Sequence, residues 1–164
     1  MIQPLINTVT FHNYWEVIGS LSLLLRKIVQ EPASILIIED YTMLSRALAQ
    51  TLTAGGYQVL TAYDADQALS FLKTNSVGLI LSDYSMPYEG DTSLCSYIQD
   101  NKNGFKDVPV VCFSSRNINV DVRQDLGLAP SDMITMPIEP EDLLEKVGRK
   151  IKRNRETKTI SFEK

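Results

Sequence analysis

The chain has few of the residues that metal-binding and secreted proteins rely on. Its 164 residues include one histidine, His12, and two cysteines, Cys95 and Cys112. Because His12 stands alone, there is no Cys/His cluster, which argues against a zinc site. Cys112 lies in an apolar run and Cys95 in a predicted helix. Both are expected to be small core residues in a reducing compartment.

Targeting signals are missing as well. Residues 1–12 have no charged amino-terminal region and no cleavage pattern, so they do not read as a signal peptide. The apolar stretch after them is interrupted by charge before it is long enough to span a bilayer. These absences predict a cytoplasmic protein with no membrane partner. The length supports one globular domain of ordinary size plus extensions.

The formal net charge of −4 conceals two unlike regions. Residues 34–147 carry 16 acidic and 7 basic residues, whereas residues 148–164 carry 2 acidic and 7 basic residues. An acidic surface repels the phosphate backbone, so the main region is a poor site for nucleic acid. The basic end could contact phosphates, but the ordinary interpretation of so short a segment is a solvated helix end and tail.

From residue 34 onward, apolar runs of strand length alternate with stretches of helical periodicity. The predicted strands are residues 34–38, 57–62, 77–82, 108–113 and 133–135. The predicted helices are one that ends at Gly55 and Gly56, one capped by Asp64 that runs to residue 73, and residues 91–99, 119–126 and 139–153. Such repeats specify a doubly wound, five-stranded parallel sheet of the α/β class. Right-handed crossovers favour the strand order 2-1-3-4-5.

An additional amphipathic helix is predicted at residues 13–30, within an amino-terminal extension of residues 1–33. Its apolar stripe consists of Trp15, Ile18, Leu21, Leu25 and Ile28. A stripe of this size must be buried, because each large side chain gains about 1.5–3 kcal/mol on leaving water. Two arrangements remain open: the helix folds back on its own domain, or it pairs with a second copy in a homodimer.

Acidic residues end the first and third predicted strands. Glu39 and Asp40 follow one apolar run, and Asp83 follows the other. Parallel neighbours lie roughly 4.8 Å apart, so three carboxylates are expected to converge on one volume. Like charges this close favour a shared cation. Hard oxygen ligands at such a corner suit Mg²⁺. The alternative is a set of solvated loop acids.

At this point the residues resemble a family, the receiver domain of bacterial two-component response regulators. The resemblance covers the βα core in order and places the domain at residues 34–148, with a basic helix end and tail at 149–164. Its marks are residues 35–40 (ILIIED), Asp83 with Met86, Pro87 and Gly90, Ser114 after VPVVCF, and Pro137-Ile138 followed by Asp142-Leu143-Leu144. The fold it implies is the flavodoxin-like receiver fold.

The resemblance also implies a role for each site residue. Asp83 would accept a phosphoryl group from a histidine kinase or a phosphotransfer protein. Mg²⁺ would be held by Asp40, by Glu39 through water, by the Asp83 carboxylate and by the backbone carbonyl of Ser85. Ser114 would be the hydroxyl that follows the phosphoryl group during switching. The protein would thus be a signalling module of a phosphorelay and not an enzyme.

Two departures from the family pattern affect the half of the site that senses phosphate. Receivers carry a lysine just before the proline of the last βα loop, and this chain has Met136. They also carry an aromatic residue on the last strand, where this chain has Met133. A thioether cannot supply the charge and three donors of a lysine. The resemblance further implies that the peptide bond before Pro137 is cis.

Two other functions are each compatible with part of this sequence. A pseudo-receiver would use the fold as a docking platform without phosphate, and Met136 favours that interpretation. A haloacid-type hydrolase shares acidic strand ends, but it would need a second aspartate two residues after the nucleophile, where this chain has Ser85. The presence together of Glu39, Asp40 and Asp83 favours the phosphorylatable receiver.

Overall fold

A computed structural model describes residues 33–100, 102–114 and 128–161, the last four of these through their backbone only. Two predicted helices, residues 13–30 and 119–126, lie outside the described residues. Within the described residues, five parallel strands form one sheet: β1 (Ser34–Ile38), β2 (Gln58–Ala62), β3 (Leu79–Asp83), β4 (Val110–Ser114) and β5 (Met133–Thr135). The strand order is β2-β1-β3-β4-β5, which confirms the predicted topology.

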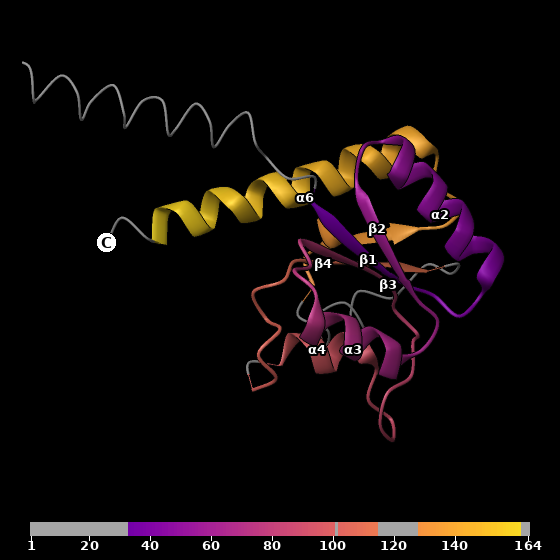
Figure 1. The fold of residues 1–164 in the computed structure, drawn as a ribbon, viewed down its shortest axis with the longest axis vertical. Helices are drawn as coiled ribbons and strands as arrows, with labels where there is room; N and C mark the ends of the chain where they lie inside the picture. The colour runs from indigo at the N-terminus through magenta and orange to yellow at the C-terminus, as the bar shows by residue number, and fades with distance from the viewer. Residues whose placement is uncertain (1–32, 101, 115–127, 162–164) are drawn as a thin grey trace, which may run out of the picture. The chain divides into compact units, whose positions relative to one another are not determined.

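Helices cover both faces of this sheet (Figure 1). The helices α2 (Thr42–Ala54) and α6 (Pro140–Ser161) lie on one face, and α3 (Ala65–Thr74) and α4 (Leu94–Gln99) lie on the other. A strand buried on both faces has no position for a polar side chain in its interior. This is why β1 reads as an unbroken apolar run in the sequence.

The core is divided into two layers by the alternation of side chains along each strand. In β1, Ile35 and Ile37 belong to the cluster under α2 and α6, whereas Leu36 and Ile38 belong to the cluster under α3 and α4. All four side chains have no exposed surface. The central strand is therefore fixed from both sides, and with it the position of the residues that follow it.

Local signals account for most element boundaries. The Asp64 carboxylate caps α3, because it accepts a hydrogen bond from the Gln67 backbone N–H at 2.8 Å. Pro109 precedes β4 because it has no N–H to donate to the sheet, although its carbonyl still accepts from Ile80 at 2.9 Å. The fourth strand consequently begins two residues later than predicted, and the third strand also begins two residues late, at Leu79.

Two helix boundaries were predicted wrongly. α4 begins at Leu94, not at residue 91, with the Ser93 hydroxyl as its cap. The preceding residues instead close a loop through an antiparallel bridge between Pro87 and Ser93. α6 continues to Ser161, past the predicted end at residue 153. Its charged second half carries no apolar periodicity from which the extension could be inferred.

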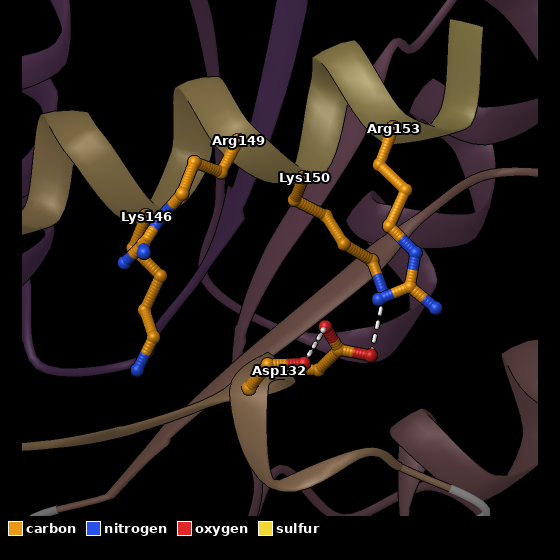
Figure 2. Close-up of a pocket in the computed structure, with 6 residues that line it drawn as sticks. Asp132, Lys146, Arg149, Lys150 and Arg153 are labelled. Atoms are coloured by element: carbon orange, nitrogen blue, oxygen red, sulfur yellow. Dashed lines mark hydrogen bonds and ion pairs between the residues drawn. The ribbon is translucent and has the colours of Figure 1, made fainter. Parts of the chain in front are cut away.

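An ion pair fixes α6 to the start of β5. Lys150 on α6 donates to the Asp132 carboxylate at 2.5 Å, and the two side chains are only 20% and 10% exposed. Figure 2 shows this pair in a pocket of about 380 Å³, whose walls also carry the basic side chains Lys146, Arg149 and Arg153. Asp132 is the one acidic residue among those that line this pocket. Its negative charge is paired directly with the ammonium group of Lys150.

Replacing Lys150 with methionine should lower the free energy of unfolding by about 1–3 kcal/mol, because the buried Asp132 carboxylate then loses its cation. Urea denaturation of both proteins measures the loss. The control is Lys152→Met, which removes a charge from an exposed position of the same helix and should change stability by about 0.5 kcal/mol or less. Equal effects of the two substitutions would contradict a structural role for the pair.

Candidate functional site

The carboxyl ends of β1 and β3 lie side by side, because Ile38 pairs with Ser82 in parallel register. The next residue of each strand, Glu39 and Asp83, therefore stands at the same edge of the sheet. β1 has β2 on one side and β3 on the other, so the strand order reverses here. In open α/β sheets, ligands bind in the crevice at this reversal.

Glu39 is buried, with 4% of its surface exposed. One of its carboxylate oxygens, Oε1, accepts a hydrogen bond from the backbone N–H of Tyr41 at 2.8 Å. Burial raises the pKa of Glu39 to about 7, with further increases from its contact with Asp40 and from the negative charge of Asp83. The Tyr41 hydrogen bond acts in the opposite direction. Glu39 therefore lies in a site with an excess of negative charge.

The Asp83 carboxylate is half-buried and is held by one residue. Its Oδ2 accepts a hydrogen bond from the Ser85 hydroxyl at 2.6 Å, and its Oδ1 accepts a longer one from the Ser85 backbone N–H at 3.2 Å. This is the turn that an aspartate forms with the residue two positions on. Asp83 is thus oriented at the end of β3 but remains accessible.

The expected convergence of the three carboxylates is only partial. Asp40 and Asp83 both act on the pKa of Glu39, so the three groups share one neighbourhood. Nevertheless, no three His, Cys, Asp or Glu side chains of the described segments form a group that could hold a metal ion as they stand. In this arrangement Glu39 accepts a hydrogen bond from Tyr41, Asp83 accepts one from the Ser85 hydroxyl, and Asp40 is exposed.

The chemistry of these donors nonetheless fits a hard divalent cation. Carboxylate and backbone carbonyl oxygens are the ligands that Mg²⁺ prefers, and Mg²⁺ needs only one or two carboxylates directly. A cation would also offset the charge that raises the pKa of Glu39. Asp40, Asp83 and the carbonyl of Ser85 could supply direct ligands, while the buried Glu39 could act through water.

Ser114 ends β4, the strand beside β3, and is 3% exposed. Asp83 pairs with Phe113, so Ser114 lies one residue further along at the same edge as the acidic groups. Its carbonyl accepts a hydrogen bond from the Met136 backbone N–H at 2.8 Å. The last βα loop is therefore connected to the strand that carries Ser114.

Met136 occupies the position before Pro137, and the peptide bond between these residues is cis, as predicted. Its side chain is half-buried and packs against the apolar cluster under α2 and α6. Met133 is 9% exposed and belongs to the opposite cluster. Met133 is thus a core residue, Met136 packs against the core from its edge, and Met136 brings no cation to the acidic edge.

The hydroxyl of Ser85 is a functional group that the sequence reasoning missed. Only the backbone carbonyl of Ser85 was considered, yet its hydroxyl makes the shortest hydrogen bond to the Asp83 carboxylate. The signal was available, because a serine two residues after an aspartate commonly closes such a turn.

A family model described as the response regulator receiver domain matches residues 35–148. Among curated proteins, the chain is similar to the transcriptional regulatory protein YvrH of Bacillus subtilis, with 28% identity over 132 residues, which cover 80% of this chain and 54% of that protein. It is also similar to the uncharacterized transcriptional regulatory protein YrkP of Bacillus subtilis, with 30% identity over 73% of this chain and 49% of that protein. The chain thus spans about half the length of these relatives.

Solved structures show the same fold at lower identity. A CheY-like receiver domain protein from Methanospirillum hungatei matches 77% of this chain and 99% of its own, with a TM-score of 0.65 and 22% identity. NtrX from Brucella abortus matches 82% of this chain and 30% of its own, with a TM-score of 0.69 and 21% identity. The agreement confirms the five-stranded fold predicted from the sequence.

Proposed function

Because this chain belongs to the response regulator receiver domain family of two-component signalling, we propose that it receives a phosphoryl group on Asp83 within a phosphorelay. The observation that supports this most is the position of Asp83, an accessible carboxylate at the switch point, beside the buried Glu39 and the exposed Asp40. The donor would be a phosphohistidine of a histidine kinase or of a phosphotransfer protein. In transfer, an Asp83 oxygen bonds to phosphorus while the bond from phosphorus to the imidazole nitrogen breaks.

Ser85 determines which part of the Asp83 carboxylate is available for this reaction. Both oxygens accept hydrogen bonds from Ser85, and the bond to Oδ1 is the longer one. An oxygen becomes a better nucleophile when its hydrogen bond is released, so Oδ1 is the oxygen that we assign to attack on phosphorus. The Ser85 hydroxyl would keep Oδ2 in place and so maintain the orientation of the carboxylate.

Charge neutralisation is the main requirement for phosphoryl transfer, since phosphorus must approach a cluster of acids. Mg²⁺, held by Glu39, Asp40, Asp83 and the Ser85 carbonyl, would supply positive charge at the phosphoryl oxygens. Ser114, on the neighbouring strand, would donate its hydroxyl to the phosphoryl group. Met136 cannot add the cation that receivers of the usual pattern have at this point.

The alternative function is a pseudo-receiver that docks partners without being phosphorylated. The specific observation in its favour is that the half-buried Met136 packs against the apolar cluster under α2 and α6, at the position where a lysine is expected. We favour the phosphorylatable receiver because the residues of the acidic half, Asp40, Asp83 and Glu39, are retained around one edge.

Mg²⁺ should bind to the full-length chain, and Asp83→Asn and Asp40→Ala should each weaken the affinity by about tenfold or more, since each removes a negatively charged ligand. Isothermal titration measures the three affinities. Asp91→Asn, at an exposed position in the loop after β3, is the control and should retain the affinity of the unaltered protein. If all four proteins bind Mg²⁺ equally, the proposed site is wrong.

Incubation with Mg²⁺ and a small acyl phosphate should add the mass of one phosphoryl group to the chain, detected by weighing the intact protein. Asp83→Asn should abolish this gain, whereas Asp91→Asn should not. A protein that folds and binds Mg²⁺ but gains no mass would instead support the pseudo-receiver. A gain that persists in Asp83→Asn would place the modification at another residue.

Met136→Lys should strengthen the structural response to phosphorylation, because a lysine can donate charge-assisted hydrogen bonds to the phosphoryl oxygens, each worth about 1.5–3 kcal/mol. The response is measured as the change in amide hydrogen exchange of the phosphorylated protein. Met136→Leu is the matched control, since it keeps the apolar packing and adds no charge. If Lys and Leu variants respond alike, Met136 does not limit switching.

The amino-terminal extension is proposed to mediate a homodimer through the stripe of residues 13–30. Removal of residues 1–31 should convert a dimer into a monomer at tens of micromolar, because the apolar surface that a partner helix would cover is then gone. Sedimentation of the full chain and the shortened one measures this. Two monomers, with the shortened chain merely less stable, would show that the helix packs on its own domain.

A further inference from the structure

The two cysteines of the sequence, which are far apart along the chain, meet in the core. Cys95 lies in α4 and Cys112 in β4, and their Sγ atoms are 2.8 Å apart. Both side chains are fully buried, and both belong to the apolar cluster under α3 and α4. They are free thiols in this structure. The sequence alone explains each cysteine as a small core residue, but it does not explain why they face one another.

A disulfide bond is about 2.05 Å long, so these sulfur atoms need to approach by less than about 1 Å to be joined. Both residues belong to the same buried cluster, so the elements that carry them already pack against one another. We propose that Cys95 and Cys112 form an intrachain disulfide when the protein meets a low-molecular-weight disulfide such as oxidised glutathione. The pair is thus a site of reversible covalent modification.

The exchange takes two steps. The two sulfurs lie within hydrogen-bond distance of one another and either can be the donor, so either can attack first as its thiolate. When Cys95 attacks first, its thiolate displaces one glutathione thiolate from the oxidised dimer and forms a mixed disulfide. Cys112, once deprotonated, then attacks the Cys95 sulfur and releases the second glutathione.

Atoms and electrons balance in this exchange. Two protein thiols lose two electrons and two protons, and one molecule of oxidised glutathione becomes two molecules of reduced glutathione. Because both sulfurs are buried, the reagent reaches them through local opening, and α4 is a helix of only six residues. Openings of short elements require less free energy than unfolding of the whole domain.

The proposed disulfide would lie close to the residues of the acidic edge. Cys112 pairs across the sheet with Ser82, the residue immediately before Asp83, and it lies two residues before Ser114. A disulfide would join α4 covalently to β4, the strand that carries Cys112 and ends at Ser114. The oxidised protein should therefore hold α4 and the end of β4 more rigidly than the reduced protein does. This effect does not depend on phosphorylation.

The test is an equilibration of the full-length chain in glutathione buffers of graded composition, with and without denaturing urea, followed by acid quenching and weighing of the intact protein. The fraction that has lost two hydrogens gives the equilibrium constant for the intrachain disulfide. In the folded protein this constant should exceed that of the urea-unfolded chain by at least about tenfold, because the fold brings the sulfurs together. The oxidised protein should also have the higher Tm.

Two variants and one blocking reaction complete the experiment. Cys95→Ser and Cys112→Ser should each show no loss of two hydrogens, and neither should gain Tm on oxidation. Alkylation of the quenched, unfolded protein should label both thiols of the reduced chain and neither thiol of the oxidised chain. A constant that is no larger in the folded protein than in urea would overturn the proposal. Disulfide-linked dimers or stable glutathione adducts in place of the internal bond would overturn it equally.

Discussion

Burial of β1 and β3 on both faces is the constraint on which the rest of this structure depends. Four consecutive side chains of β1 are fully buried, and those of β3 that pair with them are buried as well. Each large side chain contributes about 1.5–3 kcal/mol, so these strands cannot slide or turn over without losing much of the core. The polar residues at the ends of these strands, Glu39 and Asp83, are therefore carried to one edge of the sheet by the packing of the residues before them.

This placement brings like charges together at the edge of the sheet and buries one of them, Glu39. Glu39 is buried beside Asp40 and Asp83, and its pKa is raised to about 7. Asp83 accepts hydrogen bonds from neutral donors of Ser85. Neighbouring carboxylates of this kind favour the binding of a cation or of a proton. The proposed Mg²⁺ would supply this positive charge.

The basic and acidic halves of the domain are kept apart. Cations concentrate on α6, where Lys150 pairs with Asp132 and where Lys146 donates to the Met133 carbonyl at 2.5 Å. In the last loop, the half-buried side chain of Met136 packs against the apolar cluster under α2 and α6. The same loop is joined to β4, because the Met136 backbone N–H donates to the Ser114 carbonyl at 2.8 Å.

The sequence by itself determined the fold class, the strand order and the edge at which the acids lie, because apolar runs, turn residues and crossover handedness are local or nearly local properties. It also determined the cis peptide before Pro137, through the family pattern. Only the tertiary structure decided how far the carboxylates converge, that the Ser85 hydroxyl holds Asp83, and that α6 extends to Ser161. It alone brought Cys95 against Cys112. Side-chain direction and contacts between distant segments depend on packing in three dimensions, and no periodicity along the chain records them.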